Sequence, residues 1–225
     1  MIIISEPPPR LPPTGFALWQ LGFRPFYLLA SAFAASSIAL WGLQLAGWLP
    51  APWFAGPQWH AHEMLIGYSG AVIAGFLLTA VRNWTGIATT TPDQLAGLSF
   101  LWLYGRVLPF YAGLLPDALI AAVDVAFLPR LAYIVAKPLL KTQQYRNLMF
   151  VGLVLAMACA NALMHAQVLG LSESSAGLGL MLAVSIIVSM ILVIAGRVFP
   201  FFTERGLSGV VCIRNPVLDV VACAL

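Results

Sequence analysis

Residues 147–169, NLMFVGLVLAMACANALMHAQVL, contain no Asp, Glu, Lys or Arg. A helix needs about 20 mostly apolar residues to cross a bilayer core of about 30 Å. This stretch meets that requirement, and five others resemble it, at residues 26–49, 59–81, 95–115, 118–136 and 177–199. The sequence therefore predicts an all-α fold, a polytopic transmembrane helical bundle with six spans.

The composition excludes most other classes of protein. Hydrophobic residues make up 61% of the 225 residues and charged residues 8%, whereas soluble domains average about 25% charged residues. Eleven Lys and Arg residues are too few for a groove that follows nucleic-acid phosphates. The three Cys residues form neither a disulfide framework nor a spaced zinc motif. The partner that this composition predicts is a lipid bilayer, with no nucleic acid.

Three regions are expected along the chain. Residues 1–15 are rich in Pro and predict an extended cytoplasmic tail. Residues 16–207 form the six-helix transmembrane domain. Residues 208–225 combine a basic loop with an apolar run that is too short to span a bilayer, so we interpret it as the start of a truncated seventh span. Pro109, Pro116 and Pro129 lie in or between the third and fourth spans, and Pro can kink or end a helix.

The basic residues predict the orientation. Nine of the 11 fall in the tail, in alternate loops or at the end of the sixth span, while the connections at 50–58 and 170–176 hold none. Cytoplasmic loops carry the excess of Lys and Arg in membrane proteins. We therefore expect a multi-pass membrane protein with a cytoplasmic N-terminus.

All three histidines fall near the outer ends of the predicted spans. His62 and His165 lie about 4–6 Å below that surface, at 1.5 Å per helical residue. His60 and His62 are about 200° apart on a helix, so they cannot face one point. His60 and Met64 share a face and offer an imidazole with a thioether, a pair that suits copper. An imidazole on each of two helices is the arrangement that axial haem ligation requires.

Structural interpretations stay open for these residues and for two buried charges. Interfacial His and Trp residues often serve as anchors, and Met64 could be a packing residue. Arg106 and Asp124 lie at similar depth inside two spans, where an isolated charge is costly. We expect them to face inward and form a structural ion pair, and the alternative is a proton or anion pathway.

Two of the predicted spans share a short, similar segment of sequence. Residues 105–110 read GRVLPF and residues 196–201 read GRVFPF. Because the two segments would run in opposite directions, they are compatible with an inverted repeat of three plus three helices. Chance is the other explanation of so short a match.

Three sequence blocks resemble the NnrS family of bacterial inner-membrane proteins: residues 21–27 (LGFRPFY), 59–67 (WHAHEMLIG) and 74–86 (AGFLLTAVRNWTG). Residues 196–207 are similar to a fourth block of the family. The sequence departs from the family at Arg82, where the family has Pro. The resemblance implies a protein of about twelve spans, of which this chain would be the N-terminal half.

The family resemblance also implies haem and copper as cofactors, and a role in denitrification, the nitric oxide response and protection from nitrosative stress. We expect His62 and His165 to bind haem, His60 and Met64 to bind copper, and all four to be the candidate metal ligands. Nitric oxide would be the small-molecule ligand, and an electron-donor protein a further partner. The alternatives are a transporter or permease with an intramembrane Arg106–Asp124 pair, and a structural subunit of an oxidoreductase.

Overall fold

The computed structural model describes residues 17–49, 53–54, 56–207 and 209–212, and no strand occurs among them. The all-α prediction is therefore confirmed for this part of the chain. The longer helical elements are α1 (Phe23–Leu45), α2 (Pro57–His62), the π-helix η2 (Glu63–Tyr68), α3 (Ser69–Thr85), α4 (Pro92–Val107), α5 (Asp117–Lys141), α6 (Leu148–Val168) and α7 (Ser175–Gly206).

Five helical segments are long and apolar enough to cross a membrane: Phe23–Leu45, Pro57–Thr85, Asp117–Lys141, Tyr145–Val168 and Ser175–Gly206. The predicted count of six is not confirmed, because the span expected at 95–115 is not one helix. Helix α4 has 16 residues and ends at Val107, where the 3₁₀ turn Leu108–Tyr111 takes over. Pro109 lies in that turn, and Pro cannot continue the α-helical hydrogen bonding. The tail at 1–15 and the truncated span at 216–225 lie outside the described residues.

In α5, in contrast to α4, proline does not end the helix. This helix runs without interruption through Pro129 and Pro138, and Pro116 precedes its first turn. The apolar interior of the bundle surrounds it on one side, with Leu128 and Leu131 fully buried. Neighbouring helices therefore hold α5 straight enough to remain a single span.

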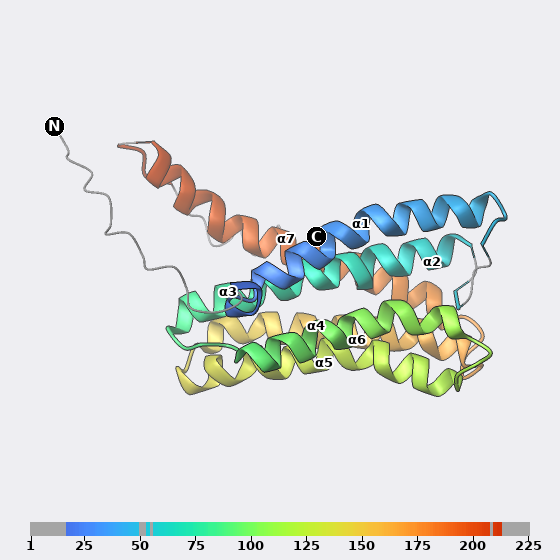
Figure 1. Cartoon of the computed structure of the whole chain (residues 1–225). Coiled ribbons are helices and arrows are strands. Elements are labelled where there is room, and N and C mark those ends of the chain that lie inside the picture. The colour runs from blue at the N-terminus through green and yellow to red at the C-terminus, as the bar shows by residue number, and fades with distance from the viewer. Residues whose placement is uncertain (1–16, 50–52, 55, 208, 213–225) are drawn as a thin grey trace.

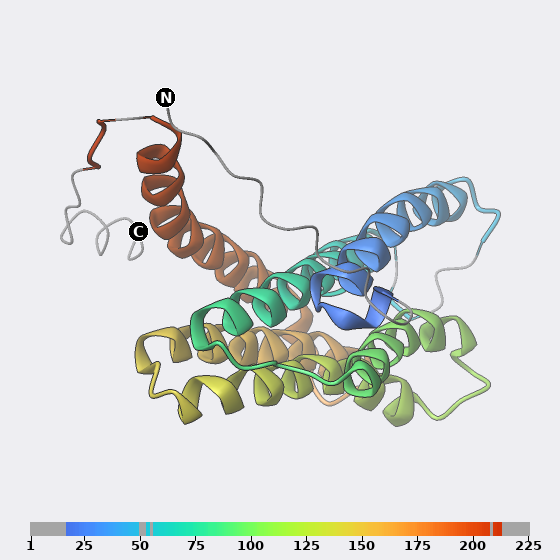
Figure 2. The same ribbon diagram turned by 60° about the vertical axis from the view of Figure 1, so that its left-hand side comes forward.

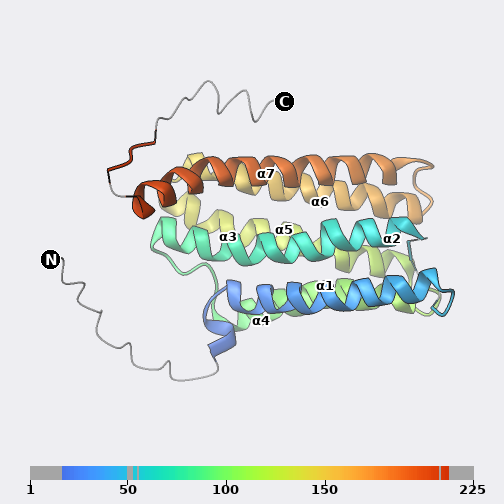
Figure 3. The ribbon, with the colours of Figure 1, turned by 90° about the horizontal axis from the view of Figure 1, so that it is seen from above.

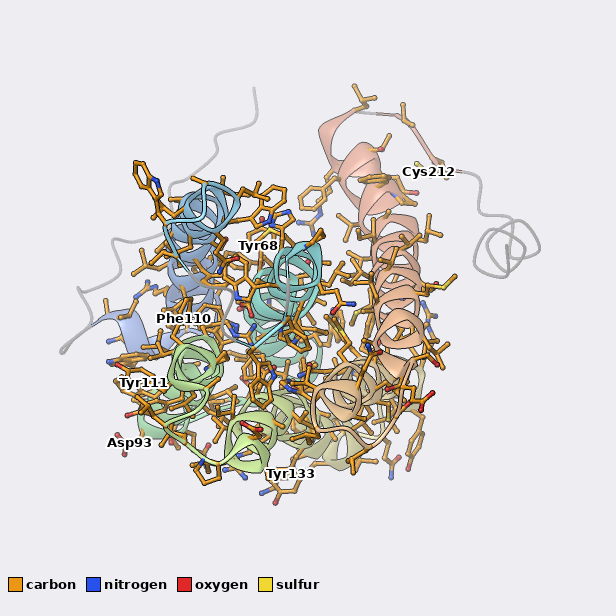
Figure 4. The ribbon with its side chains drawn as sticks, turned by 90° about the vertical axis from the view of Figure 1, so that its right-hand side faces the viewer. Tyr68, Asp93, Phe110, Tyr111, Tyr133 and Cys212 are labelled. Atoms are coloured by element: carbon orange, nitrogen blue, oxygen red, sulfur yellow. The ribbon has the colours of Figure 1, made fainter. Side chains whose placement is uncertain are left out.

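The helices form two layers with their axes roughly aligned (Figure 1). One layer holds α4, α5 and α6. In the other, α2, η2 and α3 make one long rod that lies between α1 and α7, as the views from above and along the bundle show (Figures 3 and 4). Helix η2 contacts α1, α4 and α7, and α3 contacts α1 and α5. The rod is therefore the centre of the bundle.

Helix α7 makes a very close contact with α6 in its first half. A Cβ atom on Gly179 would lie 2.5 Å from the Ala160 carbonyl oxygen, so this contact needs glycine. The last buried residue of α7 is Met190 among its described side chains. Beyond it, the red end of α7 stands away from the other helices in Figures 1 and 2.

We expect Gly179→Ala to destabilise the protein by about 1–3 kcal/mol, the usual cost of overpacking. Gly177→Ala is the matched control on the same helix, because a Cβ atom there would meet nothing within 4 Å. The control should be neutral or slightly stabilising, because Ala has the higher helix propensity. Thermal unfolding of the purified protein in detergent measures both effects. Equal unfolding temperatures for the two variants would contradict the close α6–α7 contact.

Candidate metal centre

Six polar side chains from four parts of the chain meet inside the bundle. They come from the end of α2 and the start of η2, from α4, from α5 and from α6, and each is no more than 6% exposed. The six are His62, Glu63, Arg106, Asp124, Asn161 and His165. Buried polar groups cost free energy unless they are hydrogen-bonded or paired, so these residues must satisfy one another.

Arg106 joins two carboxylates at the centre of this cluster. Its Nη1 donates to Glu63 Oε2 at 2.6 Å, and its Nη2 donates to Asp124 Oδ1. Glycines allow the helices to approach this closely. A Cβ atom on Gly67 would lie 2.9 Å from Arg106 Nη1, and one on Gly105 would lie 2.7 Å from Asp124 Oδ1. The Arg106 ion pairs therefore tie η2, α4 and α5 together.

The His62 imidazole is surrounded by hydrogen-bond acceptors. Its Nδ1 donates to Glu63 Oε1 at 3.0 Å. Its Nε2 lies 2.9 Å from Asn161 Oδ1 and 3.2 Å from Asp124 Oδ2. Two lone-pair atoms come this close only when a proton or a metal cation lies between them. The Nε2 atom of His62 therefore faces a position that suits a cation.

His165 reaches the same carboxylate oxygen from the other side. Its Nε2 lies 2.7 Å from Asp124 Oδ2, and its Nδ1 accepts a hydrogen bond of 3.0 Å from Trp53 Nε1. Because an indole N–H can only donate, the Nδ1 atom carries no proton and Nε2–H donates to Asp124. The rings of His62 and His165 are 5.5 Å apart, and Phe54 packs against both.

The donor atoms of His62, Asp124 and His165 lie within 4.8 Å of one another. Two imidazoles and a carboxylate form a ligand set that copper, iron and zinc accept. A metal ion at His62 Nε2 would replace the proton that this position otherwise needs, and it would face two carboxylates that share one guanidinium. Glu63 would accept a hydrogen bond from the other ring nitrogen of His62, as carboxylates do with metal-bound histidines. The residues therefore fit a single metal ion.

Comparison with known proteins gives one family. The family model described as NnrS protein matches residues 17–225. The chain belongs to the NnrS family. Comparisons with curated proteins and with solved structures give no match. Membership confirms the resemblance drawn from the sequence blocks.

The four metal ligands predicted for this NnrS protein fall into two groups. His62 and His165 come together in one layer, as the counting along the spans predicted. His60 points elsewhere, and its ring stacks on Trp41 at 4.0 Å. The described hydrogen bond of Met64 is made by its carbonyl oxygen, which accepts from Ser69 Oγ. The expectation that His60 and His62 face different points is therefore confirmed, while the copper pair of His60 and Met64 stays a prediction.

The expected ion pair of Arg106 and Asp124 is confirmed. It is also part of the histidine cluster, which the sequence did not indicate. Glu63 was missed, because an acidic residue in a first helical turn is explained by the helix dipole. Its position directly after His62 in an apolar span was the available signal, since an intramembrane carboxylate needs a partner.

We expect Arg106→Met to destabilise the NnrS protein by about 3–5 kcal/mol, because it leaves two buried carboxylates without their cation. Arg130→Met is the matched control, since Arg130 lies on the exposed face of α5 and should change stability by less than about 0.5 kcal/mol. Chemical or thermal unfolding in detergent measures the difference. An Arg106 variant as stable as the control would show that the ion pairs are not needed for folding.

Proposed function

We propose that this protein is an inner-membrane metalloprotein that binds nitric oxide at a redox metal and takes part in the response to nitrosative stress. The observation that carries the proposal is the buried His62 Nε2 atom, which faces the oxygens of Asp124 and Asn161. Membership of the NnrS family supports the link to nitric oxide. The helical bundle, with five segments able to cross a membrane, supports the location.

Copper is the ion that we propose for this cluster. Imidazole ligands suit copper, and copper is the non-haem metal that the family resemblance implies. His62 Nε2 and Asp124 Oδ2 would be the first ligands, with Asn161 Oδ1 beside them. His165 Nε2 can join only when Trp53 withdraws its N–H from Nδ1, because a neutral imidazole that binds metal through one nitrogen carries its proton on the other.

Binding of haem by the same residues would require a rearrangement. Asp124 Oδ2 contacts the Nε2 atoms of both His62 and His165. Both histidines could hold one haem only if the carboxylate left the space between them. His60 offers another imidazole, because its Nδ1 is buried and has no hydrogen-bond partner. We therefore propose His60 as the first haem ligand to test.

The chain's own residues prepare the cluster for a small apolar ligand. Phe54 and Trp53 cover the two histidines, and both are buried, so bulk water is kept away. A metal held there would supply an electrophilic, redox-active centre to which nitric oxide binds. Nitric oxide is apolar and can reach a buried site from the lipid, so no polar channel is needed.

In the transporter alternative, Arg106 would bind a solute as it crosses the membrane. Both partners of Arg106 are buried carboxylates of the same chain, and its guanidinium is only slightly exposed. This arrangement favours a structural ion pair over a translocation path. Uptake assays that show transport lost in Arg106→Lys, with metal content unchanged, would favour the transporter.

Variants should show which residues bind copper and which bind haem. We expect His62→Ala and Asp124→Ala to lose most of the bound copper, because even the loss of a residue that only supports a ligand typically weakens metal binding by about 10–100-fold. His60→Ala should keep the copper and lower the haem content. Elemental analysis of the purified full-length protein measures copper, and a dithionite-reduced minus oxidised absorption spectrum measures haem.

Gln167→Ala is a control variant from the same end of α6, because Gln167 accepts from the backbone N–H of Ala176 and lies outside the cluster. It should retain both metals. Full copper content in both His62→Ala and Asp124→Ala would overturn the copper assignment. An optically blank wild-type protein without metal would overturn the proposed function as a whole.

The proposed orientation has its own test. We expect alkaline phosphatase fused after Ser172, between α6 and α7, to be active because the enzyme folds in the periplasm. A fusion after Gln143, between α5 and α6, should be inactive because the positive-inside rule puts that loop in the cytoplasm. Green fluorescent protein at the same two positions should give the reverse pattern. High phosphatase activity only at Gln143 would show that the loop between α5 and α6 is periplasmic and would overturn the proposed orientation.

A further inference from the structure

An apolar groove opens where α7 leaves the bundle. One part has a volume of about 320 Å³ between η2, α3 and the middle of α7, and a second has about 480 Å³ towards the C-terminal end of α7. Phe76 and Ile194 line both parts, so the two are adjacent. Figure 4 shows Tyr68, which lines the first part, in the gap between α1 and α7.

The two ends of the groove differ in chemistry. The first part is lined almost entirely by aliphatic and aromatic side chains. The second part is lined by Arg197 as well, together with Asn83 and Trp84. Arg197 donates to Asn147 Oδ1 at 2.7 Å and lies over the Phe150 ring at 5.2 Å, and Arg146 adds a second positive charge that acts on it. The described partners of Arg197 are therefore neutral, and the charged end favours an anion.

The lining of the groove indicates its occupant. Apolar side chains line nearly all of it, and the cation of Arg197 lies in the second part only. An apolar groove with a cation in one part matches an acyl chain joined to a phosphate. Basic residues also gather at this end of the bundle, the side we expect to face the anionic inner leaflet.

We propose that this groove binds an anionic phospholipid of the cytoplasmic leaflet, with its phosphate at Arg197 and one acyl chain between α3 and α7. The lipid would fill the space left by the divergence of α7 and hold its C-terminal half against α3. The proposal is independent of the metal centre, which lies towards the opposite end of the helices.

The test measures which lipid the purified full-length protein retains. Protein reconstituted in phosphatidylcholine nanodiscs that contain a minor fraction of phosphatidylglycerol is transferred to detergent, washed, and analysed by lipid mass spectrometry. We expect enrichment of phosphatidylglycerol in the wild type. Arg197→Gln should reduce that enrichment about fivefold, which corresponds to the roughly 1 kcal/mol that one basic residue contributes at an anionic surface.

Three further variants make the result specific. Ile194→Trp fills the groove without changing charge and should lose the lipid, whereas Arg197→Lys keeps the charge and should retain it. Arg130→Gln removes a positive charge from the exposed face of α5 and should behave as the wild type. Unfolding temperatures identify any variant that fails to fold, and the Lys and Trp variants then carry the test.

Several outcomes would overturn the proposal. These are equal retention of phosphatidylcholine and phosphatidylglycerol, unchanged enrichment in Arg197→Gln, and unchanged enrichment in Ile194→Trp. Disulfide cross-linking of Ile194→Cys to a second copy, or to another part of the polypeptide, would show that protein occupies the groove instead.

Discussion

The Arg106 guanidinium, held between the carboxylates of Glu63 and Asp124, is the interaction on which the bundle depends. A single charge in the apolar interior would cost several kcal/mol, and two carboxylates without a cation would cost more. The three residues come from η2, α4 and α5, so their pairing fixes three helices relative to one another. Gly67 and Gly105 leave room for it. The ion pairs therefore set the positions of the neighbouring histidines.

Counting along regular helices was enough to predict part of this site. Arg106 and Asp124 were placed at equal depth, and His62 and His165 in one layer, because each residue of a span adds 1.5 Å. Glu63 was missed, and the union of both pairs in one cluster could not be predicted. A π-helix begins at Glu63, and such segments insert an extra residue per turn. Counting at 3.6 residues per turn then assigns the later residues to the wrong face of the helix.

Nearly identical sequence segments also have different structures, because neighbours decide the outcome. GRVLPF at 105–110 ends a helix in a 3₁₀ turn, whereas GRVFPF at 196–201 continues within α7. Gly105 packs against Asp124, but a Cβ atom on Gly196 would meet nothing within 4 Å. A buried ion pair holds the first arginine in place, and the second lies at the edge of a groove. Local sequence therefore cannot predict which prolines end a helix, or which arginines form a buried ion pair.

Asp124 divides two tasks between its two oxygens. Oδ1 neutralises Arg106 and so serves the fold, while Oδ2 faces His62, Asn161 and His165 and so serves the candidate site. A metal ion that binds Oδ2 leaves the contact with Arg106 in place. The bundle can then hold the same helix positions with or without the ion, because the charge that it needs is already supplied by Arg106. Preorganisation of this kind keeps the ligands close together before the metal arrives, which lowers the cost of binding.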